Sequence, residues 1–127
     1  MKRHLRWLAA LILCPVAANA ASTDSIFAKL EPEERAHQAC VVLGLSKIRK
    51  DHKFRHADRL KTGVLGRATY SGTRVTTVGG AVRSDHKWYK LTFDCTVTKD
   101  QMKATAFSYE IGKEIPRERW DDIGLWD

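Results

Sequence analysis

The sequence predicts an α+β domain, with one main N-terminal helix packed on an antiparallel sheet of three to five strands. An apolar pattern of helical period follows Pro32, and a strict alternation of apolar and polar residues starts at Tyr89. Each of these segments contains a cysteine, Cys40 and Cys95, so a crosslink could tie the helix to the sheet. The length of 127 residues suits one domain and excludes a barrel enzyme or a two-lobed nucleotide enzyme, each of which needs roughly 200 residues.

Residues 1–20 have the pattern of a cleavable signal peptide. Basic residues precede an apolar run of about a dozen residues, shorter than the roughly 20 that a membrane span needs, and Ala18-Asn19-Ala20 has the form that signal peptidase cuts. We therefore expect export to the periplasm, cleavage after Ala20, and a mature chain without a transmembrane span. We expect residues 21–31 to form a spacer with a short helical or docking patch, and residues 32–127 to form a single domain.

The mature chain is only moderately basic. The full chain has 22 Lys and Arg against 15 Asp and Glu, and removal of the leader leaves 19 against 15, because Lys2, Arg3 and Arg6 go with it. Much of the formal basicity therefore belongs to the targeting signal, and nucleic acid is not an expected partner.

Two cysteines remain after the leader, which contains Cys14, is removed. An even pair in an exported chain indicates a disulfide between Cys40 and Cys95. Closing a loop of about 55 residues would stabilise the fold by roughly 4 kcal/mol on the chain-entropy model. Free thiols or a metal site are the alternatives, but the chain has no CxxC and no histidine at zinc-finger spacing from either cysteine.

The main helix is predicted from Pro32 to about Lys47. Proline suits the first helical position, and Glu33 and Glu34 lie where the helix dipole favours negative charge. Apolar residues extend around much of its circumference, which predicts a mostly buried helix with Cys40 facing the core.

The middle of the chain is harder to assign. Residues 47–61 are basic and predict either a short second helix or an irregular connector, followed by a weak strand near 64–70. Residues 74–78 are β-branched and predict a strand; Gly79-Gly80 predicts a turn, after which residues 81–83 resume the strand.

A long hairpin is the clearest pattern. In residues 89–97 apolar and polar side chains alternate with period two, which predicts a half-buried strand. Residues 99–101 predict a turn, and residues 102–111 predict the second strand of the hairpin. Gly112 is expected to end this strand, Pro116 to start a short turn or helix through Trp120, and the tail around Trp126 to close the core.

Aromatic, cysteine and charged landmarks follow one another along the mature chain. They are Glu33–Gln38, Cys40, Phe54, Asp58-Arg59, Ala81, Arg83-Ser84, Trp88-Tyr89, Leu91, Phe93, Cys95, Phe107, Tyr109, Ile111-Gly112, Ile115-Pro116, Trp120 and Gly124-Leu125-Trp126. This pattern resembles the bacterial domain-of-unknown-function 930 family. The resemblance implies an exported envelope protein of alphaproteobacteria, and it implies no established reaction, substrate, cofactor or catalytic residue. Residues 61–77 contain no landmark of the family.

Catalytic and metal-binding patterns are weak. His52 and His56 are spaced so that a helix would place both rings on one face, but no Glu follows His52 as in HExxH, and Lys53 and Arg55 would repel a cation. We therefore expect no metal, no cofactor and no catalytic residue, and a small hydrolase or a metal-binding protein remains an alternative.

Two binding hypotheses follow. In the first, a basic segment meets an anionic envelope component such as a lipid headgroup, a lipopolysaccharide phosphate or a peptidoglycan carboxylate; its residues are Lys50, Lys53, Arg55, Arg59 and Lys61. In the second, exposed aromatic residues bind an envelope protein; they are Trp88, Trp120 and Trp126, which could equally fill the core. We expect a non-catalytic binding or scaffolding module of the cell envelope.

Overall fold

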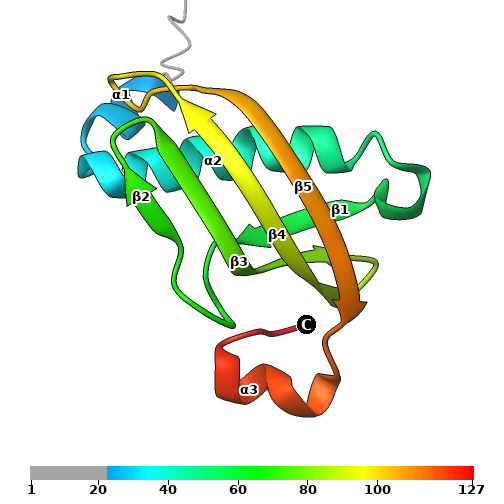
Figure 1. Ribbon diagram of the computed structural model, residues 1–127. Helices are drawn as coiled ribbons and strands as arrows, with labels where there is room; N and C mark the ends of the chain where they lie inside the picture. The colour runs from blue at the N-terminus through cyan, green and yellow to red at the C-terminus, as the bar shows by residue number, and fades with distance from the viewer. Residues whose placement is uncertain (1–22) are drawn as a thin grey trace, which may run out of the picture.

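The computed structural model describes residues 23–127 and confirms the predicted α+β class (Figure 1). The signal peptide predicted at residues 1–20 lies outside the described residues. In chain order the elements are α1 (Thr23–Ala28), α2 (Pro32–Ile48), the 3-10 helix η1 (His52–Phe54), β1 (Ala57–Lys61), β2 (Thr69–Ser71), β3 (Arg74–Ser84), β4 (Lys87–Val97), β5 (Ala104–Glu114), the 3-10 helix η2 (Arg117–Arg119) and α3 (Trp120–Ile123).

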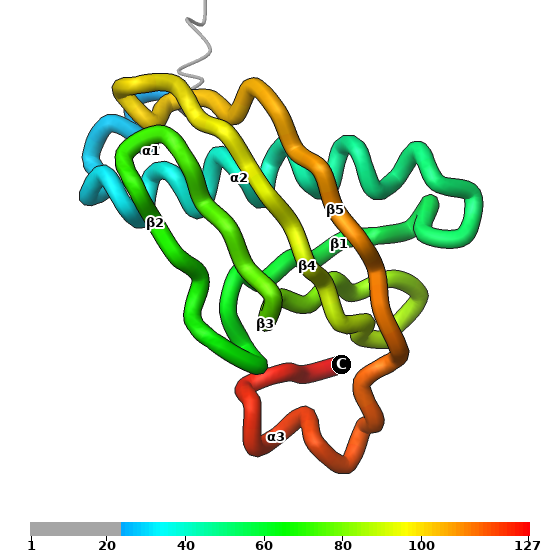
Figure 2. The backbone as a smooth tube through the Cα atoms, viewed as in Figure 1, coloured from blue at the N-terminus to red at the C-terminus, as the bar shows by residue number. Residues whose placement is uncertain are grey.

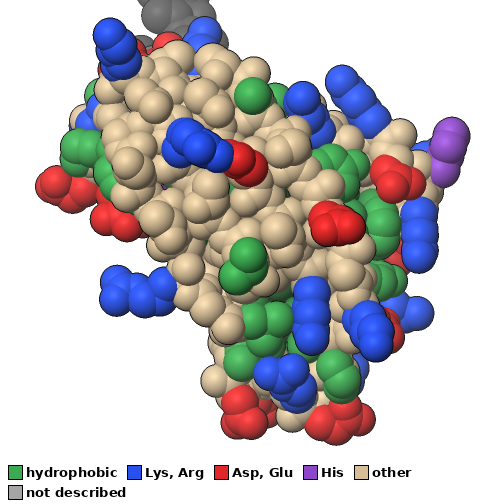
Figure 3. Space-filling model, in the orientation of Figure 1, with side chains coloured by type: hydrophobic (Ala, Val, Ile, Leu, Met, Phe, Trp, Pro, Cys, Tyr) green, Lys and Arg blue, Asp and Glu red, His purple; other side chains and the backbone are tan. Residues whose placement is uncertain are grey.

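The strands form one antiparallel sheet in the order β1-β3-β4-β5. The short strands β1 and β2 share one edge of β3, because β1 pairs with residues 81–84 and β2 with residues 74–76. Helix α2 crosses one face of the sheet, and Figures 1 and 2 show it behind β3, β4 and β5. No helix of residues 23–127 covers the opposite face, which we call the uncovered sheet face. Figure 3 shows it to consist mainly of backbone and neutral polar side chains.

Helix α2 forms where the sequence predicts it, with Pro32 in its first turn. Its buried side is narrower than predicted. Apart from the neighbours Ala39 and Cys40, the buried residues lie at intervals of three or four, whereas Val42 is 59% exposed and Lys47 is exposed. The reason is geometric, since the helix touches the sheet along one side only. Gly44 lies on that side, where a Cβ would come within 2.7 Å of Phe107 Cζ.

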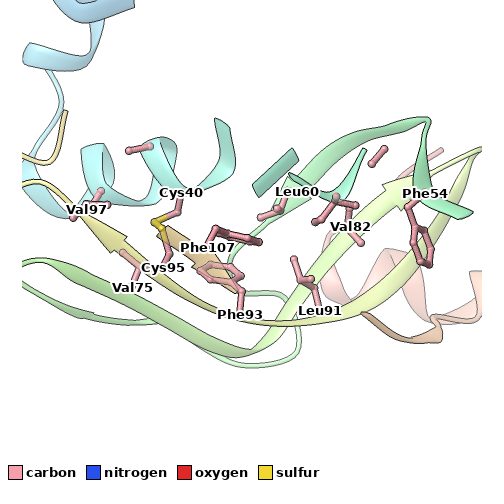
Figure 4. Packing of buried hydrophobic residues seen from close by; sticks show 14 residues of the cluster. Cys40, Phe54, Leu60, Val75, Val82, Leu91, Phe93, Cys95, Val97 and Phe107 are labelled. Atoms are coloured by element: carbon pink, nitrogen blue, oxygen red, sulfur yellow. A yellow bond between two sulfur atoms is a disulfide. The ribbon is translucent and has the colours of Figure 1, made fainter. Parts of the chain in front are cut away.

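The main core lies between α2 and the sheet (Figure 4). The predicted disulfide joins Cys40 of α2 to Cys95 of β4, and both residues are completely buried. The rings of Phe93 and Phe107 stack at 4.8 Å beneath the helix. The alternation of β4 therefore directs its apolar side chains toward the helix, as predicted.

The structure corrects the assignment of Gly79-Gly80, which is not a turn. Strand β3 runs without interruption from Arg74 to Ser84, with a shift in its register against β4 between Thr77 and Gly80. The backbone of the preceding loop crosses β3 here, since the Gly79 carbonyl accepts from the Val64 and Leu65 N–H groups at 2.8 and 2.9 Å. A Cβ on Gly79 would lie 2.5 Å from the Gly66 nitrogen, so glycine permits the crossing.

Three further boundaries differ from the sequence prediction. The basic connector contains strand β1, which was not predicted, and the predicted strand near 64–70 is reduced to Thr69–Ser71. Strand β5 continues past Gly112 to Glu114. For β1 and for the end of β5, the deciding contact is pairing with a strand that is distant in sequence, which local composition does not record.

A second buried cluster closes the lower end of the sheet in Figure 1. It is formed by Ala81, Trp88, Ile115, Trp120 and Leu125. The indole N–H of Trp88 donates to the Trp126 carbonyl at 2.8 Å, and that of Trp120 donates to the Ile115 carbonyl at 3.0 Å. The tail therefore closes the core as predicted, held by hydrogen bonds as well as by apolar contact.

Replacing both cysteines with alanine should lower the free energy of unfolding by about 4 kcal/mol, because the loop of 55 residues would no longer be closed in the unfolded chain. Urea unfolding of the double variant measures this loss. Wild-type protein unfolded in a reducing agent is the control and should show a similar loss; an unchanged midpoint in both would contradict the prediction.

Gly44→Ala should destabilise the protein by about 1–2 kcal/mol, because overpacking against the stacked Phe107 ring outweighs the gain in helix propensity. Thermal or urea unfolding measures the change. Ser46→Ala, at an exposed position of the same helix, is the matched control and should leave stability unchanged or slightly higher. Equal stability of the two variants would show that α2 can move away from the sheet without cost.

Candidate functional site

The loop between α2 and β1 carries three of the five predicted basic residues, Lys50, Lys53 and Arg55. We call these three side chains the basic loop. The Asp51 carboxylate accepts from the Lys53 backbone N–H at 3.0 Å and so caps η1. Phe54 is buried and packs edge-to-face on Tyr89 at 5.1 Å. The backbone beneath the basic loop is therefore anchored to the sheet.

The two ends of this loop are also joined. Arg49 donates from Nε to the Ala57 carbonyl at 2.6 Å, which connects the end of α2 to the start of β1.

The cations of the basic loop are exposed to solvent. Among residues 23–127, no carboxylate forms an ion pair with Lys50, Lys53 or Arg55. Lys53 Nζ lies 5.6 Å from the Phe54 ring centroid, and Arg55 Nη2 lies 2.7 Å from His52 Nδ1. Their charges therefore remain available to an anion from solvent.

The other two predicted basic residues lie on β1 and contact different groups. Arg59 Nη1 donates to the Asp58 carbonyl at 2.9 Å. Lys61 Nζ donates to the Gly124 carbonyl at 3.0 Å and lies 4.3 Å from the Trp126 ring centroid. The tertiary structure thus assigns Lys61 to the C-terminal tail and not to the basic loop.

Asp58 directly precedes Arg59 on β1, and its carboxylate is bound by Arg83. Both guanidinium nitrogens, Nε and Nη2, donate to its carboxylate, at 3.0 and 2.7 Å. These hydrogen bonds are the main cause that lowers the pKa of Asp58 below its usual 3.8, and the charges of Arg83 and Arg59 lower it further. The acid therefore neutralises little of the basic loop.

The structure does not bring His52 and His56 together as a ligand pair. Helix η1 ends at Phe54, so the two residues do not share a helix face. His52 Nδ1 contacts Arg55, and His56 Nδ1 lies 2.8 Å from the Asp85 carboxylate. In the part of the chain that the structure describes, no group of three or more His, Cys, Asp or Glu side chains could hold a metal ion.

His37 ties α2 to the segment after β1. Its Nδ1 lies 2.7 Å from Thr62 Oγ1, and its Nε2 is buried at 3.9 Å from the Glu33 carboxylate. His37 therefore lies at the edge of the core.

The three candidate tryptophans have different environments. Trp88 and Trp120 are buried in the second cluster, so their rings are not presented to a partner in this conformation. Trp126 is 47% exposed and packs edge-to-face on Trp88 at 6.0 Å. A partner surface on the aromatic residues would therefore be centred on Trp126 and Lys61.

Sequence reasoning did not single out the hollow of the uncovered sheet face. Its volume is about 560 Å³, and Arg67, Thr69, Thr76, Thr77, Val78, Thr92, Phe93, Asp94, Ser108, Tyr109 and Glu110 line it. Arg74 pairs with Asp94 beside it. The alternation of β4 shows that Thr92 and Asp94 share a face, but the contribution of β2 and β5 appears only when the sheet forms.

Arg83→Gln should raise the pKa of Asp58 toward 3.8, because it removes both hydrogen bonds to the carboxylate. A carboxyl whose pKa is lowered in the folded state stabilises the fold above its unfolded pKa, and this contribution disappears as pH falls. The stability difference between wild type and Arg83→Gln should therefore shrink below pH 3.8.

NMR titration of the side-chain carboxyl carbon, with urea unfolding at several pH values, measures both effects. Arg59→Gln is the control and should shift the pKa less, since Arg59 contributes only its charge. Equal shifts in the two variants would contradict the assignment.

The comparisons with known proteins assign the chain to a family. None of the helices within residues 23–127 combines the length and apolar character needed to cross a membrane. No curated protein and no solved structure matches the chain. Residues 27–125 match the family described as Domain of Unknown Function (DUF930), a match that covers well over half of the chain. The chain belongs to the DUF930 family.

Proposed function

We propose that this protein is a non-catalytic binding module of the bacterial cell envelope, exported to the periplasm, and that its basic loop binds an anionic envelope component. The observation that carries the proposal is that Lys50, Lys53 and Arg55 are exposed without a carboxylate partner in residues 23–127. Figure 3 shows Lys, Arg and His side chains projecting at the end of the molecule where α2 leads into β1.

The geometry of the basic loop favours anion binding over a role as a solvated charged surface. Because Phe54, Asp51 and Arg49 hold the backbone, the three cations project from a fixed base, and an anion would not have to order the loop first. Phosphate and carboxylate groups suit such cations, and Arg55 can contact two oxygens of one group through its planar guanidinium.

Export is supported by two independent features. Residues 1–20 have the leader pattern, and the buried Cys40–Cys95 disulfide is typical of proteins that fold in an oxidising compartment. Anionic lipids, lipopolysaccharide phosphates and peptidoglycan carboxylates are the abundant anionic groups that an envelope protein would meet.

Trp126 favours a second candidate function, the binding of a protein partner. It combines a half-exposed aromatic ring with an adjacent cation, Lys61, and aromatic and cationic side chains are enriched at interfaces. This surface is built by the tail and β1, whereas the basic loop lies between α2 and β1, so mutations can separate the two functions.

A vesicle-binding experiment tests the first proposal. The mature protein should sediment with vesicles that contain phosphatidylglycerol and cardiolipin, and not with vesicles of phosphatidylcholine alone. Binding should weaken as salt rises, because exposed charges are screened over about 8 Å at physiological ionic strength. The triple variant Lys50→Glu, Lys53→Glu, Arg55→Glu should weaken binding about a hundredfold, because three residues at roughly 1 kcal/mol each near the surface give ~3 kcal/mol.

The matched control is Lys99→Glu, Lys103→Glu, Lys113→Glu, which changes the net charge equally at exposed positions elsewhere. If both triple variants lose binding equally, net charge and not the basic loop is responsible. If neither variant loses binding, the loop is a solvated surface and the anionic-ligand proposal is rejected. If an envelope protein crosslinks to the wild type and to both triple variants but not to Trp126→Ala, the second function is favoured.

A further inference from the structure

The hollow on the uncovered sheet face has a charged residue at each of two opposite edges. Arg67 lies just before β2, at one edge of the sheet, and Glu110 lies on β5, at the other edge. Both side chains are exposed. Neither forms an ion pair with any residue of 23–127. A ligand in the hollow would therefore meet one free cation and one free anion.

The third charged residue that lines the hollow already has a partner. Asp94 of β4 accepts from Nε of Arg74 at 3.3 Å, and the two side chains form an ion pair. Lys90 of β4 lies on the same face, but it does not line the hollow and forms no ion pair with Glu110. The charges that remain for a ligand are those of Arg67 and Glu110.

Hydroxyl groups and one apolar side chain lie between these two charges. The strand register places one row of side chains across β2, β3, β4 and β5, namely Thr69, Thr76, Asp94 and Ser108. In the next row Thr92 lies opposite Glu110. Val78, where the register of β3 shifts, is 86% exposed. The hollow thus offers hydrogen-bonding groups and an apolar contact between its charged edges.

The distance between the edges sets the length of a ligand that can reach both charges. Strands β2 and β5 are separated by two other strands, and neighbouring strands lie roughly 4.8 Å apart, so the hollow spans about 14 Å. An extended peptide advances about 3.3 Å per residue, so about four residues cover this distance.

We propose that this hollow binds a short extended peptide of about four residues with both termini free. Its carboxylate meets the guanidinium of Arg67, which can contact both oxygens of one carboxylate, and its ammonium group meets Glu110. The hydroxyl groups of Thr76, Thr92 and Ser108 can each donate or accept a hydrogen bond, so they suit the N–H and C=O groups of an extended backbone.

The same features disfavour other classes of ligand. A lipid headgroup or another polyanion would be repelled by Glu110. Sugar rings commonly stack on exposed aromatic rings, and the two aromatic residues that line the hollow offer no such ring. Phe93 is buried, and Tyr109 is partly buried and packs on Phe107 in the main core. The pair of opposite charges therefore favours a zwitterionic peptide.

NMR titration of the isotope-labelled mature protein with tetra-alanine tests this inference. The backbone amides of Thr76, Thr92 and Ser108 should shift. Acetylation of the peptide's N-terminus or amidation of its C-terminus should each weaken binding about fivefold, since each removes one exposed ion pair. Dialanine, which is too short to reach both charges, should bind about fivefold more weakly as well.

Two variants assign each terminus to its residue. Arg67→Gln should bind tetra-alanine and its amide equally, but should still bind the acetylated peptide more weakly. Glu110→Gln should do the reverse. Lys99→Gln and Glu118→Gln are the matched controls, because each removes one charge at an exposed residue outside the hollow, and both should bind like the wild type. Circular dichroism checks that every variant folds.

Several outcomes would overturn the proposal. They are no shift at the hollow, equal binding of the free and capped peptides to the wild type, and variants that do not distinguish the two caps. Stronger binding of chitotetraose, an uncharged glycan, would assign the hollow to sugars instead. The basic-loop triple variant should bind tetra-alanine like the wild type, because none of its three residues lines the hollow. Failure here and failure of the anionic-ligand proposal can therefore be told apart.

Discussion

The close contact between α2 and the sheet is the constraint on which the rest of the structure depends. Small residues on the buried side of the helix, Gly44 among them, let its backbone approach the stacked rings of Phe93 and Phe107. The Cys40–Cys95 disulfide joins the two layers covalently across 55 residues of sequence. Because both cysteines are fully buried, the crosslink lies within the apolar core.

The position of the basic loop follows from that contact. Where α2 ends beyond the sheet, the chain must turn back to pair as β1 with β3, and Arg49 and Phe54 hold the turn from its two sides. The cations in this turn face solvent because the apolar side chains of the same segment are needed in the core.

The second buried cluster gives the tryptophans their roles. Trp88 and Trp120 each bury an indole and satisfy its N–H with a backbone carbonyl, which is how a core accommodates this side chain. Trp126 contributes its carbonyl to this arrangement while its ring remains half-exposed beside Lys61. The fold thus buries two of these tryptophans and leaves the ring of the third half-exposed.

The sequence by itself determined the elements whose signals are local. Helix α2, the β4–β5 hairpin and the pairing of Cys40 with Cys95 follow from periodicity and from a count of cysteines, and the family follows from landmarks along the chain. Only the tertiary structure decided that Gly79-Gly80 continues a strand, that β1 exists, and that Lys61 belongs to the tail. The physical reason is that these outcomes depend on which backbone crosses or pairs from a distance. A glycine that permits a close crossing has the same local signature as a glycine in a turn, and an edge strand of charged residues has the same composition as a loop.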